Sequence, residues 1–167
     1  LLADDYYIEE RVLLVSEFKG QRREVINEVV VKGATKMVAV DLFVDGGLIH
    51  CIRGDGAIVG APTGSTSYLL ATGGPIVAPG VHCIIVNGIN EHRFASRALI
   101  LPDTSEIRLR INGDTRDSEM FVSHDGRDKL PIEVGEEVAI RRSPSPAKLI
   151  FFERHTFFRN LKERLDW

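Results

Sequence analysis

Residues 37–52 read MVAVDLFVDGGLIHCI, and this stretch decides the fold class. Two apolar runs, 37–44 and 48–52, flank Asp45-Gly46-Gly47, a turn whose glycines can take a positive φ without steric cost. Short runs of branched and aromatic side chains on both sides of such a turn are typical of paired strands. The stretch therefore predicts an antiparallel hairpin.

The same period of two extends outward along most of the chain. Residues 6–18 and 22–31 form a second pair of candidate strands around Lys19-Gly20-Gln21. Asp125-Gly126 is most economically a turn. So many short strands predict a mainly β protein, an antiparallel β-sandwich with stacked sheets. The further candidate strands are 57–60, 83–86, 98–101, 106–111, 120–123, 137–142 and 148–152.

Two segments depart from the β pattern. Residues 66–71 follow a cluster of Pro, Gly, Ser and Thr and predict one short helix, capped by the hydroxyl of Ser65 or Thr66. In the tail, Phe157, Leu161 and Leu165 are spaced four apart, as on one face of a helix. A C-terminal helix over 157–165 is therefore expected to pack on the sheets.

Composition limits the classes of function. The 167 residues are 44% hydrophobic and 27% charged, which predicts one packed domain. A net charge of −3 disfavours nucleic acid as a partner. Cys51 and Cys83 lie far apart, and neither they nor the five histidines have metal-ligand spacing, so no metal site is predicted.

The chain gives no sign of a membrane or of secretion. No apolar run approaches the roughly 18 to 20 residues that span a bilayer. The first five residues are acidic and lack the basic opening of a signal peptide. We therefore expect a cytoplasmic protein with reduced thiols.

The densest chemical signal is residues 53–68, RGDGAIVGAPTGSTSY. A strand leads here into a loop rich in hydroxyls and glycines that opens a helix, where free backbone N–H groups favour polar or anionic ligands. The stretch matches neither the Walker A nor the dinucleotide fingerprint. Ser65 lacks the flanking glycines of a hydrolase nucleophile, because Thr63 and Ser67 stand there. A simple turn with a capped helix stays open as an alternative.

A second signal is the polar pair Asn27-Glu28 inside an apolar run. Successive strand side chains point to opposite faces, so burying both needs partners, a bulge or a ligand. Glu28 could accept hydrogen bonds from two sugar hydroxyls, and Asn27 could both donate to and accept from a base edge. A polar pair at a strand end is the alternative interpretation.

Together these pieces resemble the C-terminal half of NAD kinase. The resemblance implies a β-sandwich and transfer of a phosphoryl group, from ATP or polyphosphate with Mg²⁺ or another divalent cation, to the 2′-hydroxyl of the adenosine ribose of NAD, which gives NADP. Such chemistry asks a protein mainly for positioning and charge neutralisation. The matching stretches are NEVV at 27–30, DG at 55–56, PTGSTSY at 62–68, GGPI at 73–76, the region 97–107, SHDG at 123–126 and the tail from 157.

The resemblance assigns roles to individual residues. It implies that Asn27 and Thr66 contact the adenine, that Glu28 binds the ribose hydroxyls and that Tyr68 lies against the nucleotide. Asp55 would meet the nicotinamide end, often across a subunit boundary. The remaining expected contacts with the cofactor come from Lys36, Arg53, Thr63, Ser65, Ser67 and Ala71.

One family motif is missing from the sequence. NAD kinases carry Gly-Gly-Asp-Gly in an upstream α/β domain, and its aspartate is taken as the catalytic base, whereas this chain has only Arg53-Gly54-Asp55-Gly56. Residues 1–167 are therefore expected to be a C-terminal domain that binds NAD and NADP and assembles into a homodimer or homotetramer. They would supply no catalytic residue and would be inactive alone. The alternative is a non-catalytic β-sandwich interaction or regulatory domain; a relative of the lipid kinases is disfavoured, because Tyr68 and Asn27-Glu28 suit a nucleotide better.

Overall fold

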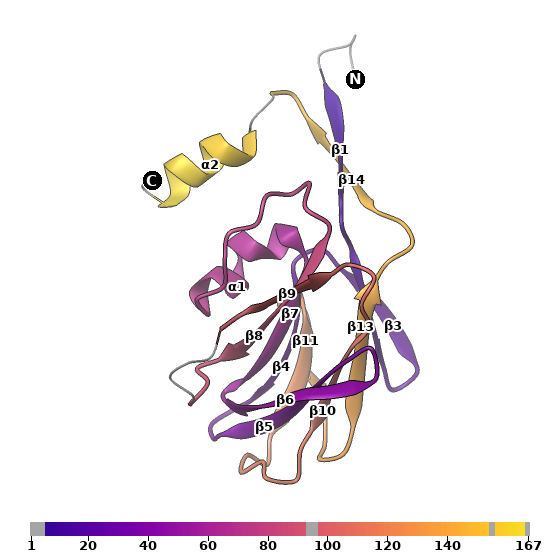
Figure 1. Ribbon diagram of the computed structural model, residues 1–167, viewed down its shortest axis with the longest axis vertical. Coiled ribbons are helices and arrows are strands. Elements are labelled where there is room, and N and C mark those ends of the chain that lie inside the picture. The colour runs from indigo at the N-terminus through magenta and orange to yellow at the C-terminus, as the bar shows by residue number, and fades with distance from the viewer. Residues whose placement is uncertain (1–5, 93–96, 154–155, 166–167) are drawn as a thin grey trace.

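The computed structural model describes residues 6–92, 97–153 and 156–165, and it has two stacked antiparallel sheets with a two-stranded ribbon beyond one end (Figure 1). The first sheet has the order β3 (Gln21–Val25), β2 (Leu14–Phe18), β13 (Glu137–Arg142), β10 (Ile107–Ile111), β5 (Val38–Val44) and β6 (Gly47–Gly54). The second has the order β12 (Leu130–Pro131), β11 (Met120–His124), β4 (Glu28–Gly33), β7 (Gly56–Gly60), β8 (Cys83–Ile89) and β9 (Leu99–Pro102). The predicted antiparallel sandwich is confirmed.

The hairpin at 37–52 forms as predicted. Strands β5 and β6 pair antiparallel around Asp45 and Gly46, whose φ angles are 49° and 85°. The second strand extends to Gly54, two residues beyond the predicted end, and the register shifts between Leu42 and Phe43. This extension brings the chain directly to Asp55 and the start of β7.

The prediction of one strand pair from 6–18 and 22–31 is only half right. Strands β2 and β3 pair as expected, but β1 (Tyr7–Arg11) pairs with β14 (Ala147–Phe151) in the separate ribbon. The second run also divides, because β3 ends at Val25 in one sheet and β4 begins at Glu28 in the other. No glycine or proline stands at either crossing, so the sequence carries no turn signal where the chain changes sheets.

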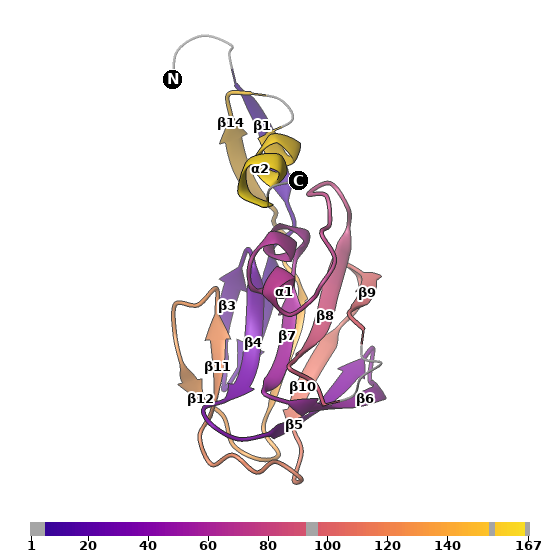
Figure 2. The same ribbon diagram turned by 90° about the vertical axis from the view of Figure 1, so that its left-hand side faces the viewer.

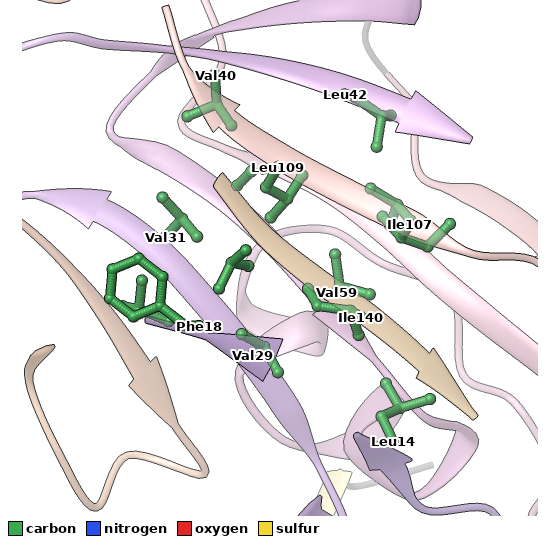
Figure 3. Close-up of a cluster of buried hydrophobic side chains, with 14 of the residues drawn as sticks. Leu14, Phe18, Val29, Val31, Val40, Leu42, Val59, Ile107, Leu109 and Ile140 are labelled. Atoms are coloured by element: carbon green, nitrogen blue, oxygen red, sulfur yellow. The ribbon is translucent and has the colours of Figure 1, made fainter. Parts of the chain in front are cut away.

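The main core fills the space between the two sheets (Figure 3). Every second residue of β4 and β7 enters it, and the facing strands β5, β10 and β13 contribute branched side chains in the same way. Burying each such side chain contributes about 1.5–3 kcal/mol. Among the core residues are Val29, Val31, Val59, Val40, Leu42, Leu109 and Ile140.

A second apolar cluster covers the outer face of the second sheet. Figure 2 shows α1 (Tyr68–Ala71) in front of the upper parts of β4, β7 and β8. Leu69 of this helix is fully buried against Ile58 and Ile85, which point away from the main core. Strand β7 is consequently buried on both faces over all five residues. This double burial makes the strand a rigid base for the loop that follows it.

The helical segments differ in detail from the expectation. The loop forms a 3₁₀ turn, η1 (Pro62–Thr66), and α1 begins only at Tyr68. No side chain caps either element, so the predicted cap by Ser65 or Thr66 is wrong. The Ser65 hydroxyl bonds to the backbone of Val77 instead, because it is fully buried beside that segment.

The C-terminal helix α2 (Thr156–Leu165) lies beside the β1–β14 ribbon rather than on the sandwich (Figure 1). It faces a cavity that β14 and η1 also line, and Leu161 is buried there. The side chain of Leu165 lies outside the described residues. The prediction that this helix exists is confirmed, whereas its expected packing on the sheets is wrong. In the described part of the chain, no helix is long and apolar enough to cross a membrane.

Candidate functional site

The chain crosses from β3 to β4 at Ile26 and Asn27, and Asp125 holds this crossing in place. Oδ1 of Asp125 accepts hydrogen bonds from the backbone N–H groups of Asn27 (2.9 Å) and Glu28 (3.1 Å), and Oδ2 accepts one from Ile26 (3.1 Å). The backbone N–H of Asp125 donates in return to the Glu28 carbonyl (3.0 Å). The polar pair Asn27-Glu28 is thus fixed where β4, an inner strand of the second sheet, begins.

Glu28 is a buried acid with unused hydrogen-bonding capacity. Its side chain lies opposite Gly60 of β7, the residue is 6% exposed, and Oε2 has no hydrogen-bond partner. Burial raises the pKa of Glu28 to about 7, the charge of Asp125 adds to the rise, and the Ser67 hydroxyl opposes it. Buried polar atoms without a partner are rare in proteins. The unpartnered oxygen singles out Glu28 as a candidate ligand-binding residue.

The glycines of the loop let its backbone approach Asn27 closely. A Cβ on Gly64 would lie 2.2 Å from the Asn27 carbonyl oxygen, and one on Gly60 would lie 2.8 Å from the same atom. The backbone N–H of Ala61 donates to that oxygen at 2.9 Å. Glycine is required here because any side chain would push the loop away from the polar pair.

Tyr68 joins the same site from the start of α1. Its side chain is half-buried, and its pKa is raised first by burial and then by the charges of Asp55 and Glu28. Two stretches remote in sequence, Asn27-Glu28 and Ser67-Tyr68, therefore face each other. This is the juxtaposition that the resemblance requires.

Asp55 lies at the far end of the same strand pair. It immediately precedes Gly56, which is opposite Lys32, whereas Glu28 is opposite Gly60. Four residue steps along β7 separate the two ends by roughly 13 Å. The Asp55 carboxylate is exposed and accepts a hydrogen bond from Asn90 at 2.7 Å. Asp55 thus reaches the site only at its margin.

The hydroxyls of the loop divide into two groups. Ser65 is used within the fold, since its oxygen accepts from the Val77 N–H at 3.0 Å. Thr66 and Ser67 are exposed, and Thr63 has a buried hydroxyl oxygen without a partner. Thr63 and Thr66 also line a cavity of about 220 Å³ that is closed on the other side by β14 and α2.

The cavity brings in Arg11, a residue that the sequence did not single out. Arg11 is 6% exposed, is paired with Glu9 and lies over the ring of Phe151, and its Nε has no hydrogen-bond partner. Nothing in the local pattern of β1 marked it, because the pairing of β1 with β14 is a long-range contact. The cavity thus offers two unsatisfied groups, the Arg11 Nε–H and the Thr63 hydroxyl, beside apolar walls.

Three predicted contact residues lie away from Glu28. The Arg53 guanidinium is paired with Asp114 at 2.7 Å. Lys36 is exposed, and its backbone N–H is held by Asp117 at 2.7 Å. Ala71 is exposed at the end of α1. None of the described contacts of these residues brings them to the polar pair.

Comparison with known proteins identifies the family. A family model described as "ATP-NAD kinase C-terminal domain" matches residues 26–152, which include both facing stretches of the site. The chain belongs to this family. The family resemblance inferred from the sequence is thereby confirmed.

Relatives of this NAD kinase family member support the assignment along the whole chain. The NAD kinase of Syntrophotalea carbinolica is 33% identical over 100% of this chain and 60% of the relative. The NAD kinase of Marinobacter nauticus is 34% identical over 100% of this chain and 59% of the relative. The chain thus spans about three fifths of the length of the curated relatives it matches.

Two solved structures have the same fold. Yeast NADH kinase complexed with NADH superposes with a TM-score of 0.87 at 26% identity, over 96% of this chain and 49% of that chain. An NAD kinase from Archaeoglobus fulgidus in complex with ATP gives 0.79 at 28% identity, over 95% and 60%. The sandwich with its ribbon and C-terminal helix is therefore the family's fold.

Proposed function

We propose that this chain is the NAD-binding part of an enzyme that phosphorylates the 2′-hydroxyl of the adenosine ribose of NAD and so forms NADP. The support is membership of the family, the names of its relatives, and the ligands named in the two solved structures, NADH and ATP. The observation that carries the proposal is the buried Glu28 carboxyl, whose free oxygen faces the loop that ends in Tyr68.

In this proposal each residue has a task. Glu28 accepts hydrogen bonds from ribose hydroxyls, which satisfies its free oxygen. Asn27 and Thr66 contact the adenine, and the half-buried ring of Tyr68 lies against the nucleotide. The Thr63 hydroxyl is a further donor on the cavity side. In this proposal Ser65 acts indirectly, by tying the loop to Val77.

Phosphoryl transfer needs neutralisation of the phosphate charge as well as positioning of the reactants. Among the described residues, no three His, Cys, Asp or Glu side chains are grouped to hold a metal ion. We therefore assign Mg²⁺ to none of them, and a divalent cation would arrive with the phosphates of the donor, ATP or polyphosphate. Glu28 binds and orients the ribose in this scheme, and residues 1–167 alone would bind NAD without forming NADP.

We further propose self-association, as a homodimer or homotetramer in the cytoplasm. The exposed Asp55 precedes β7, whereas Glu28 is opposite the last residue of β7, and the charges of both act on Tyr68. A position at the margin suits the role that the resemblance gives it, at the nicotinamide end of a nucleotide bound by a neighbouring copy. Lys36 and Arg53, which lie away from the polar pair, would serve the same boundary.

Isothermal titration with NAD tests the proposal. Glu28→Ala and Tyr68→Ala should each weaken NAD binding at least about tenfold, because each removes a contact worth roughly 1.4 kcal/mol. Glu17→Ala, at an exposed position of β2, is the matched control and should leave the affinity unchanged. If the folded protein does not bind NAD, the result favours the alternative function, a non-catalytic interaction domain.

A further inference from the structure

We propose that Asp125 is a positioning residue of the nucleotide site, which sets the backbone of Ile26, Asn27 and Glu28 so that the polar pair meets the ligand. This inference rests on the proposed function. Asp125 touches no expected part of NAD in this scheme and acts through the residues it holds.

The hydrogen bonds of Asp125 account for all three backbone donors at the crossing. Its two carboxylate oxygens accept from Ile26, Asn27 and Glu28 at 2.9–3.1 Å. Ile26 and Asn27 lie between β3 and β4, and Glu28 is the first residue of β4, so the carboxylate supplies acceptors where the chain passes from one sheet to the other. Hydrogen bonds to an ionised carboxylate are stronger than neutral ones. One side chain therefore determines the direction in which Asn27 and Glu28 project.

Asp125 is itself rigidly mounted. It occupies a turn at φ 48°, followed by Gly126 at φ 68°, and the turn is closed by a hydrogen bond from the Arg127 N–H to the His124 carbonyl at 2.9 Å. The buried ring of His124 is anchored between Asp128 and Ser16, each at 3.0 Å. The carboxylate thus has little freedom to leave the crossing.

The charge of Asp125 also acts on Glu28. The groups that face Glu28 are Asp125 from the turn after β11, and Ser67 and Tyr68 from the start of α1. Burial comes first in raising the pKa of Glu28, and the Asp125 charge comes second. Near neutral pH, Glu28 can therefore be present both as an acid that donates a hydrogen bond and as a carboxylate that accepts one.

The chain offers a matched control in Asp117. This residue is 6% exposed, whereas Asp125 is half-buried, and the Asp117 carboxylate also accepts three backbone hydrogen bonds, from Thr35, Lys36 and Glu119 at 2.7–3.1 Å. It supports the loop at the other end of β4, away from Glu28. A purely structural role for both aspartates would make their variants behave alike.

The experiment compares Asp125→Asn with Asp117→Asn in the longest form of the protein that carries this chain. NAD affinity is measured by calorimetric titration at pH values from about 5.5 to about 8.5. Circular dichroism checks the fold. Asp125→Asn should weaken NAD binding about tenfold. It should also move the pH midpoint of the affinity downward, since Glu28 loses a neighbouring charge. Asp117→Asn should lower the melting temperature and leave the pH profile of the affinity unchanged, because Asp117 holds the backbone of Lys36 and not that of Glu28.

A second measurement does not depend on the variants folding. In the unaltered protein, the amides of Ile26, Asn27 and Glu28 should exchange slowly with solvent, and unprotected amides would overturn the inference. Equal affinities and equal pH profiles for the two variants would overturn it as well. If the unaltered protein does not bind NAD at all, the proposed function fails; if it binds NAD and Asp125→Asn binds equally well, only this inference fails.

Discussion

The two faces of strand β4 divide stability from binding. Val29 and Val31 point inward and are fully buried between the sheets, where each is surrounded by apolar side chains. Glu28 points to the outer face, where Val30 packs in the second apolar cluster but the Glu28 carboxyl has an unpartnered oxygen and a raised pKa. The strand is made rigid by its inner face, and that rigidity holds the polar face ready for a ligand. Changes on the two faces should therefore have separable effects.

The largest expected effect comes from the core against which the inner face of β4 packs. Leu109→Ala, at a fully buried position of β10, should lower the free energy of unfolding by about 3 kcal/mol, because it leaves a cavity in the core. Urea denaturation measures the loss. At temperatures where the variant is folded, its NAD affinity should match that of the unaltered protein. A large loss of affinity in the folded variant would show that the faces are coupled.

Gly64→Ala should have the next largest effect on stability. Unlike Leu109→Ala, it should also abolish NAD binding. The new Cβ would lie 2.2 Å from the Asn27 carbonyl oxygen, so the loop must move away from the polar pair. We expect a loss of about 2 kcal/mol in stability, typical of overpacking, together with loss of detectable NAD binding. Calorimetric titration and urea denaturation are compared with Gly113→Ala, whose Cβ would meet no atom within 4 Å. Unchanged NAD binding would contradict the close approach.

Much of this division could be predicted from the sequence. The period of two fixed the sandwich and the hairpin at 37–52, and the polar pair Asn27-Glu28 stood out because it interrupts an apolar run. The changes of sheet at 12–13 and 26–27 could not be predicted, because no glycine or proline marks either place. Asp125 was interpreted as a turn residue, which is correct, but its bonds to a crossing almost a hundred residues earlier depend on the folded topology.

Ser65→Ala tests a link between the faces and should cost less. The hydroxyl bonds to both the N–H and the carbonyl of Val77, and its removal leaves those buried groups without that partner. We expect a loss of about 1 kcal/mol in stability. Thermal denaturation measures it, with Ser118→Ala, at an exposed position, as the control. Equal melting temperatures for the two variants would show that the Ser65 hydroxyl does not hold the loop in place.

A further expectation is a dependence of stability on pH. The pKa of Glu28 is about 7 in the folded protein and 4.5 ordinarily, so the folded state holds the proton more tightly. Its stabilising contribution is complete below pH 4.5 and declines as the pH rises to about 7. Glu28→Gln, which cannot ionise, should therefore gain stability relative to the unaltered protein between pH 5 and pH 8, conditions that bracket this titration. If the difference in melting temperature between Glu28→Gln and the unaltered protein stays constant across that interval, Glu28 has its ordinary pKa.

The central claim is that Asn27-Glu28 and Ser67-Tyr68 together hold the adenosine part of NAD. Titration of NAD into isotopically labelled protein, followed by amide chemical shifts, tests it most directly. The account predicts that the largest changes in amide chemical shift fall on these four residues and on Thr66. The amide shift of Leu109 in the core should stay the same. Changes that gather around Arg53 and Asp114, with none at Glu28 or Tyr68, would contradict it.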